Sequence, residues 1–267
     1  MKIDVTALIL TFNEQENIHR TLSALGWARE VVMIDSGSSD RTIEIAKSVR
    51  PDVHVLQREF DSFATQCNFG LSQISTEWVL SLDADYVLTP ELIAEIAALN
   101  PAPDLAGYSV EFRYCIFGRP LRSTVYPVRA VLYRRQRAQY RDEGHGHRVV
   151  IDGKVEKLSG RIDHDDRKPF SHWLRSQDNY AIIEARHLLS QPLEKLNAQD
   201  RLRRAIFFAP QGMFLYLLFG RGLILDGWPG WFYVAQRTIA ELMLSVRLLI
   251  ERETLKSKAT RNKATSG

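Results

Sequence analysis

Short apolar segments alternate with helix-like segments through the first hundred residues, and this alternation restricts the fold more than any other feature. Four apolar runs, at 5–10, 31–34, 53–56 and 78–82, have the length and composition of strands buried on both faces of a sheet. The segments between them carry apolar residues at helical spacing. This order predicts an α/β fold with a mainly parallel sheet.

Two helix starts are marked by side chains that can cap a helix. Asn13 precedes one helical segment, with Glu16 three positions later as in a capping box. Thr89 precedes another, and Pro90 then takes the first helical position. Both caps are expected to bond to the helix that follows them.

Polar side chains follow three of the four apolar runs. They are Thr11, Asn13 and Glu14 after the first, Asp35 and Ser36 after the second, and Asp83 and Asp85 after the fourth. In parallel sheets ligands bind beyond the carboxyl ends of the strands, so three polar ends favour a binding site, although each alone is equally typical of a cap or turn. The first strand is not followed by G-x-G-x-x-G, which argues against a dinucleotide site.

The carboxylates of Asp83 and Asp85 are separated by one residue at the end of a buried run. In an extended backbone, side chains two apart point to the same face. Two such oxygen ligands suit Mg²⁺ or Mn²⁺ carrying a phosphorylated ligand. For an isolated D-x-D the commoner structure is a solvated turn, and the pattern alone does not choose between the two.

Three segments together resemble the family 2 glycosyltransferases. They are LTFNE at 10–14, WAREVVMIDSGSSDRT at 27–42 and SLDAD at 81–85, and their order and spacing are similar to the branch that holds lipopolysaccharide-core β-glucosyltransferases. The resemblance covers roughly residues 3–190. It implies a GT-A fold, a nucleotide-diphospho-sugar donor (a UDP-sugar is expected), and Mg²⁺ or Mn²⁺ as cofactor.

The resemblance also implies roles for individual residues. Asp35 would bind the base or ribose, Asp83 would lie near the ribose and the metal, and Asp85 would be the direct metal ligand. The remaining nucleotide-sugar positions implied in this way are Thr11, Asn13, Glu14, Ser36, Gln66 and Asn68.

Residues 142–147 read DEGHGH and are dense in groups that accept a proton. An inverting transfer needs a base beside the acceptor hydroxyl. The resembled branch has a His-Glu pair here, but this sequence departs from it and aligns Gly146-His147 with the pair. The candidate bases are therefore Asp142, Glu143, His145 and His147, and we favour Glu143.

His164 opens the segment HDDRKP. Its imidazole could complete the metal shell or contact the diphosphate, and Arg167 or Lys168 could neutralise phosphate. The alternative is a plain helix start in which the aspartates act as caps.

The C-terminal part is predicted to be a helical extension, with a transferase domain at 1–195 and the extension at 196–267. An apolar run at 206–219 is interrupted by Pro210 and Gly212 and is too short to cross a bilayer, which favours an interfacial or re-entrant segment. With nearby tryptophans and a basic tail at 252–263, it predicts monotopic membrane association. The alternative is a helical hairpin packed on its own domain or, in a homodimer, on a second subunit.

Composition restricts the remaining choices. A net charge of +3 gives no reason to expect nucleic acid, and two cysteines without a C-x-x-C motif fit a reducing compartment. The apolar run at 5–10 is too short for a signal sequence, so the chain is expected in the cytosol.

The leading hypothesis is an inverting, metal-dependent glycosyltransferase at the cytoplasmic face of the inner membrane, acting on an envelope glycolipid. Two alternatives stay open. A nucleotidyltransferase would carry a glycine-rich basic loop after its first strand, which 11–17 lacks. A non-catalytic membrane-bound scaffold would have lost acidic residues that this chain keeps.

Overall fold

The computed structural model describes residues 3–143 and 146–265, without the side chains of 143, 146, 147 and 258–265. Contacts within the chain divide it into two compact units, Met1–Lys168 and Pro169–Gly267. This division lies before the predicted domain boundary at residue 195. The reason is that α5 (Phe170–Ser190) packs against α8 (Trp228–Thr265), the last helix of the chain.

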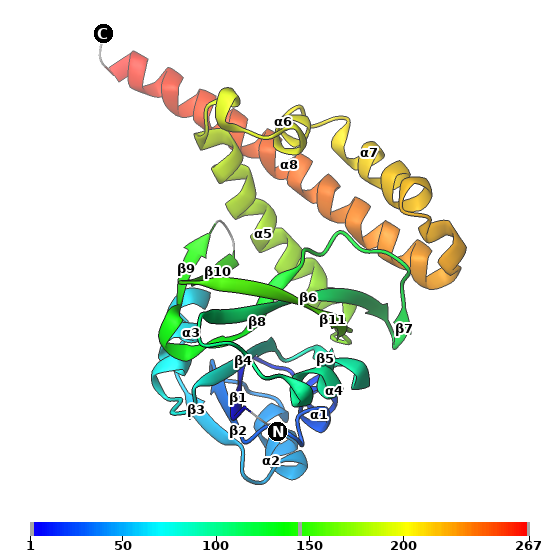
Figure 1. Ribbon diagram of the computed structural model, residues 1–267. Helices are drawn as coiled ribbons and strands as arrows, with labels where there is room; N and C mark the ends of the chain where they lie inside the picture. The colour runs from blue at the N-terminus through cyan, green and yellow to red at the C-terminus, as the bar shows by residue number, and fades with distance from the viewer. Residues whose placement is uncertain (1–2, 144–145, 266–267) are drawn as a thin grey trace. The chain divides into compact units, whose positions relative to one another are not determined.

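The first unit is built on a mixed sheet (Figure 1). Its parallel part has the order β3-β2-β1-β4, with bounds β1 Val5–Thr11, β2 Glu30–Asp35, β3 His54–Gln57 and β4 Trp78–Asp83. The sheet continues through β8 (Arg129–Arg134), β6 (Leu105–Ile116), β11 (Lys154–His164) and β5 (Tyr86–Leu88), and β7 (Arg119–Pro120) pairs with β6. A separate hairpin consists of β9 (Ala138–Glu143) and β10 (Gly146–Ile151). The predicted α/β class is confirmed.

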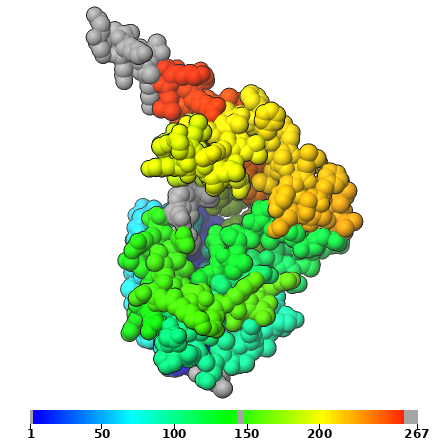
Figure 2. Space-filling view, turned by 45° about the horizontal axis from the view of Figure 1, so that its top comes forward, coloured from blue at the N-terminus to red at the C-terminus, as the bar shows by residue number. Residues whose placement is uncertain are grey.

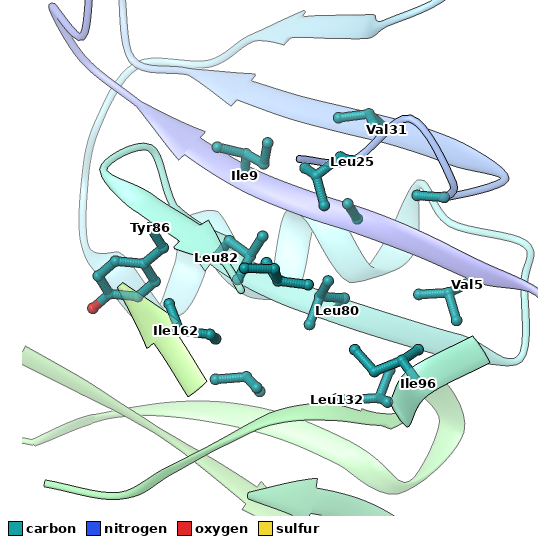
Figure 3. Close-up of a cluster of buried hydrophobic side chains, with 14 of the residues drawn as sticks. Val5, Ile9, Leu25, Val31, Leu80, Leu82, Tyr86, Ile96, Leu132 and Ile162 are labelled. Atoms are coloured by element: carbon teal, nitrogen blue, oxygen red, sulfur yellow. The ribbon is translucent and has the colours of Figure 1, made fainter. Parts of the chain in front are cut away.

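Helices cover both faces of this sheet. They are α1 Ile18–Ser23, α2 Thr42–Val49, α3 Phe63–Ser72 and α4 Pro90–Ala98, with a short 3₁₀ turn η1 at Arg135–Arg137. One cluster of buried side chains joins β1 and β4 to α1, α2 and α4 (Figure 3). A second cluster places α3 on the other face, through Ala64, Cys67 and Leu71. Coverage on both sides explains why β1 and β4 are almost continuously apolar.

The two predicted helix caps have different outcomes. The Thr89 hydroxyl accepts from Leu92 N at 3.3 Å and Pro90 opens α4, so this cap is confirmed. The Asn13 cap is wrong, because α1 begins only at Ile18 and Asn13 has a left-handed φ of 53°. Its side chain instead accepts from Ser39 N at 2.9 Å. The loop after β1 is therefore bonded to the loop after β2.

The second unit is helical. Between α5 and α8 it contains η2 Leu193–Lys195, α6 Ala198–Arg204, α7 Ala209–Leu215, the π-helical turn η3 Tyr216–Gly220 and η4 Leu223–Asp226. Ala185 and Leu188 of α5 pack with Leu244 and Leu248 of α8. Figure 2 shows the segment from α6 to η4, in yellow and gold, as a continuous surface of this unit. Within 3–143 and 146–265, no helix is long and apolar enough to cross a membrane.

Candidate active site

The ends of β4 and β11 bring Asp85 and His164 together. Asp85 lies in the turn between β4 and β5, and β5 pairs antiparallel with β11 so that Tyr86 stands opposite His164. As a result His164 Nε2 lies 3.0 Å from Asp85 Oδ2. The main chain supports this contact, since Asp165 N donates to Asp85 O at 3.2 Å.

The pair has the chemistry of two ligands of one cation. Neighbouring ligands of an octahedral cation stand about 3 Å apart when each lies about 2.1 Å from the ion, and the Asp85–His164 distance matches that separation. The side chains are 13% and 15% exposed, so a ligand can reach them. His164 Nδ1 is buried and has no hydrogen-bond partner among the described residues.

Asp85 and His164 each shift the pKa of the other. Burial acts to raise the pKa of Asp85, but the imidazole of His164 outweighs it and the pKa is lowered. For His164, burial acts to lower the pKa, and the Asp85 carboxylate reverses this so that the pKa is raised. Without a metal the site therefore favours a carboxylate beside an imidazolium, and a metal would displace the imidazolium proton.

Asp83 is not part of a larger ligand cluster. Across the described residues there is no group of three or more His, Cys, Asp or Glu side chains suited to a metal. Asp83 is half-buried at the last position of β4. A cation held by Asp85 and His164 alone would have its other positions open, as Mg²⁺ sites that carry substrate phosphates do. A role for Asp83 at the metal stays a prediction.

Asn17 connects the loop after β1 to the segment that follows His164. It is fully buried, and its Nδ2 donates to Glu14 Oε2 at 2.8 Å and to Asp166 Oδ1 at 2.9 Å. Its Oδ1 accepts from Arg20 Nη2 at 2.7 Å and from Arg167 N at 2.9 Å. Sequence reasoning missed this residue, because nothing in a lone Asn before a helix reveals a partner 149 positions away.

Lys168 lies beside the carboxylates at the same place. Its Nζ is 2.5 Å from Glu14 Oε1, and Asp85 is among the charges that raise the pKa of the ammonium against burial. Burial raises the pKa of Glu14 to about 7, although Lys168 opposes this effect. Lys168, Glu14 and Asp85 therefore share a small, poorly hydrated region. A phosphate that enters this region would compete with Glu14 for Lys168.

The predicted nucleotide residues of β1 and β2 do meet. Thr11 Oγ1 donates to Asp35 Oδ1 at 3.0 Å, and Asp35 is fully buried. Asp35 also accepts from Gly37 N at 3.1 Å and from Ser38 N at 2.9 Å. Asn13 N donates to Ser38 Oγ at 2.9 Å, and this bond joins the two loops at one edge of the sheet. Their convergence is what the sequence predicted, while nucleotide contacts by them stay a prediction.

Glu14 and Ser36 also lie at this edge. Glu14 N donates to Thr42 Oγ1 at 2.7 Å, which ties the loop to the start of α2. Ser36 Oγ accepts from Gln66 Nε2 at 3.3 Å.

Gln66 and Asn68 have structural partners. Gln66 Nε2 donates to the carbonyls of Arg58 and Glu59 at 3.0 and 3.1 Å, and Gln66 Oε1 is buried without a partner among the described residues. Asn68 bonds both ways with the main chain of Tyr140, at 3.0 and 2.9 Å. It therefore fixes the position of β9, which carries the candidate bases.

Three of the candidate bases belong to the strands β9 and β10: Asp142 and Glu143 end β9, and His147 lies in β10. Asp142 accepts from Ser62 Oγ at 2.9 Å and from Ala64 N at 3.2 Å, so its carboxylate caps the start of α3. His145 lies outside the described residues, as do the side chains of Glu143 and His147. The choice among these three stays a prediction. The carboxylate of Asp142 is already engaged in two hydrogen bonds at the start of α3.

Aromatic rings surround His164, and the sequence did not reveal them as a group. The ring of Tyr114 lies 4.7 Å from the imidazole, that of Tyr126 5.0 Å and that of Tyr86 5.2 Å. The hydroxyls of Tyr86 and Tyr126 are hydrogen-bonded. The guanidinium of Arg129 lies 4.8 Å from the Tyr126 ring.

The sequence of this chain matches a known family model. Residues 6–153, more than half of the chain, match the model described as glycosyl transferase family 2. The chain belongs to this family. The prediction of a family 2 glycosyltransferase is confirmed, and together with the observed sheet the family confirms the GT-A class. The nucleotidyltransferase and scaffold alternatives gain no support.

Individual relatives of this family 2 member are distant. The lipopolysaccharide core biosynthesis glycosyltransferase LpsC of Rhizobium meliloti (strain 1021) is 26% identical over 267 residues, which covers 96% of each chain. The structure of S. aureus TarS 1–349 with UDP-GlcNAc is 15% identical, with a TM-score of 0.47 and coverage of 90% of this chain and 82% of that one. Glucosyl-3-phosphoglycerate synthase from Mycobacterium tuberculosis, with Mn²⁺, UDP and phosphoglyceric acid, is 16% identical, with a TM-score of 0.46 and coverage of 71% and 80%. Neither score reaches the level that would establish a shared fold by itself.

Proposed function

We propose that this glycosyltransferase moves a sugar from a nucleotide-diphospho-sugar, with a UDP-sugar as the expected donor, to a glycolipid of the cell envelope such as lipopolysaccharide core. The observation that carries the proposal is the Asp85–His164 pair at the end of β4, beside the joined loops of β1 and β2. The acceptor class is supported by the relative LpsC, a lipopolysaccharide core biosynthesis glycosyltransferase that matches 96% of this chain.

In this proposal Asp85 and His164 hold a divalent cation, Mg²⁺ or Mn²⁺, with Asp83 close by. When bound, such a cation supplies positive charge to the departing diphosphate. Lys168 adds a second positive charge from the side of Glu14. Asn13 and Ser36 form the wall against which the nucleoside lies, and the buried Thr11–Asp35 hydrogen bond holds the two strand ends that carry them.

The reaction is a single displacement with inversion. The acceptor hydroxyl oxygen attacks the anomeric carbon from the face opposite the diphosphate, and the bond from that carbon to the diphosphate oxygen breaks. The hydroxyl proton passes to a base on the β9–β10 hairpin, and Glu143 is the favoured residue. Asn68 and Asp142 support that hairpin through Tyr140 and α3.

The proposal places the enzyme at the cytoplasmic face of the inner membrane, where nucleotide sugars and nascent glycolipids meet. A homodimer formed through the C-terminal helices is part of the same hypothesis, since Val246 and Ile250 of α8 are exposed while Glu241 is buried. Light scattering of the purified chain tests the dimer directly, and a monomer at all concentrations would remove it.

Release of nucleoside diphosphate tests the proposed reaction. Wild-type protein is incubated with a panel of nucleotide sugars, a divalent cation and a lipid extract that contains the acceptor. We expect release from one donor that requires both the extract and the metal. No release with any donor would contradict the proposal, and release of a nucleoside monophosphate or pyrophosphate would indicate nucleotidyl chemistry instead.

A further inference from the structure

Exposed apolar side chains are concentrated in the second unit. Of 25 large apolar side chains exposed among the described residues, 18 belong to 169–267 and ten of these to 202–231. The most prominent are Phe207, Phe208, Leu215, Tyr216, Phe219 and Leu225, with exposed fractions of 50–69%. These six residues are called the apolar surface below. A water-facing surface rarely keeps so many aromatic and aliphatic groups without something to cover them.

The helical segment that carries this surface is suited to leave water. From 205 to 220 the sequence contains no charged residue. Its main chain is paired internally: Gly212 N donates to Phe208 O at 2.9 Å and Arg221 N to Tyr216 O at 2.8 Å. Backbone groups bonded within a helix can enter an apolar medium without the cost of losing water.

The length of the segment decides how it can meet a bilayer. Twelve helical residues, 209–220, extend about 18 Å, well short of the roughly 30 Å hydrocarbon core. Ala209, Pro210, Leu217 and Leu218 face the protein and are buried, so only one side is available. A one-sided apolar helix of this length lies in the interface and does not cross.

Charge favours lipid over a second copy of the chain. Residues 169–267 hold 14 Lys or Arg against 8 Asp or Glu, a formal charge of +6, while the whole chain carries +3. Exposed arginines stand at both ends of the uncharged segment, Arg201 before it and Arg221 after it. Trp228 and Trp231, about half exposed, follow at the start of α8. Cations and tryptophans beside an apolar helix suit anionic headgroups, whereas a symmetric contact between two copies of the apolar surface would bring Arg201 and Arg221 of one copy close to those of the other.

We propose that the apolar surface inserts into the interface of a bilayer containing anionic phospholipid. The side chains of Phe207, Phe208 and Phe219 enter the acyl boundary while the flanking arginines meet phosphate. This inference rests on the proposed function in one respect: membrane binding would serve to hold the active site near a lipid-linked acceptor. Binding itself needs neither donor nor acceptor, so it can fail or succeed independently of the glycosyl transfer.

Vesicle flotation of the full chain tests the proposal. Neutral phosphatidylcholine vesicles are compared with vesicles that also contain phosphatidylglycerol, for wild type and for Phe207→Ser/Phe208→Ser. The matched control is Leu193→Ser/Leu255→Ser, which removes two leucines that are also more than half exposed (52% and 53%) but lie outside the apolar surface. Thermal unfolding midpoints check that each variant is folded, and Phe219→Ser/Leu225→Ser serves if the first pair is not.

We expect wild type and the control to float with the anionic vesicles and the double phenylalanine variant to bind about tenfold more weakly or worse. Salt should weaken the binding of wild type, because part of the attraction is electrostatic. Equal binding by both double variants, or no binding by wild type, would overturn the proposal. So would a lipid-free wild-type dimer that the phenylalanine substitutions convert to a monomer, because the surface would then be a subunit interface.

Discussion

His164 Nε2 and Asp85 Oδ2 are 3.0 Å apart although 79 residues separate them in the chain. The contact arises from strand register: β5 leaves the Asp85 turn and pairs with the end of β11, which places Tyr86 opposite His164. The same register holds Asp165 next to Arg20 of α1, and Lys168 next to Glu14 in the loop that follows β1. One end of β11 therefore completes the part of the site that holds Glu14 and Asp85, which come from the first 85 residues.

The first prediction concerns pH and metal binding. The carboxylate of Asp85 raises the pKa of His164 above its ordinary value, and a metal can bind Nε2 only after the proton has left. Affinity for Mn²⁺ in the presence of nucleoside diphosphate should therefore rise with pH, over a range above the one in which an ordinary histidine titrates.

Calorimetry in two buffers of different ionisation enthalpy measures both the affinity and the proton released. His164→Gln should bind more weakly and lose most of the proton release. If His164→Gln released as many protons on metal binding as wild type does, another group would be the one that titrates. The folding stability of the metal-free protein should depend on pH in the opposite direction. The Asp85–His164 ion pair contributes its full stability below the pKa of histidine in the unfolded chain. This contribution is lost as pH rises through the raised pKa of His164 in the folded protein.

The second prediction concerns Lys168. Its ammonium bonds Glu14 at 2.5 Å and lies in the field of Asp85, where a diphosphate would replace Glu14 as its partner. Lys168→Gln should weaken binding of nucleoside diphosphate by about tenfold and binding of the free nucleoside little, because only the phosphates carry the charge. Arg167→Gln is the matched control, since Arg167 pairs with Asp165 instead. Equal losses for diphosphate and nucleoside would indicate a structural effect.

The third prediction separates two neighbouring acids. Asp142 caps α3 through Ser62 and Ala64, so Asp142→Ala should lower stability by about 1 kcal/mol and change turnover little. Glu143→Gln should instead lower kcat by about a hundredfold or more and leave donor binding unchanged, if Glu143 accepts the proton. The opposite ranking in turnover would transfer the role of base to Asp142.

The fourth prediction concerns packing beneath the site. A Cβ on Gly160 of β11 would lie 2.5 Å from Leu92 Cα of α4, and a backbone contact of that kind cannot yield by rotating a side chain. Gly160→Ala should therefore destabilise the chain by about 1–3 kcal/mol in urea unfolding. Gly26→Ala, where nothing lies within 4 Å, is the control and should be close to neutral. A neutral Gly160→Ala would mean that α4 and β11 are less tightly packed than described.

Much of the first unit could be predicted because local pattern determines it. Strands buried on both faces are continuously apolar, as β1 and β4 are, and polar residues at their ends converge because parallel strands end at one edge. Thr89 was correctly assigned as a cap because its bond is local. Asn13 was not, because its partner Ser39 lies on the loop that follows the neighbouring strand β2.

What could not be predicted depends on long-range register. Nothing near Asn17 or Tyr126 in the sequence indicates that Asn17 bonds to Asp166 or that Tyr126, with Arg129 on its ring, packs on His164. The buried Glu241 of α8 shows the same limit. Glu241 is buried because Arg203 of α6 reaches it at 2.6 Å, which leaves apolar Leu242 and Val246 exposed. A periodic pattern predicts a helix but not which side of it finds a charged partner.

The central claim is that the Asp85–His164 pair holds the metal that assists departure of the nucleoside diphosphate. The most direct measurement compares metal-dependent release of nucleoside diphosphate from the active donor by wild type and by Asp85→Asn, which is nearly isosteric. Wild type should require Mn²⁺ or Mg²⁺, and Asp85→Asn should lose about a hundredfold or more of that release while remaining folded. Metal-independent release by wild type that Asp85→Asn leaves unchanged would contradict the account.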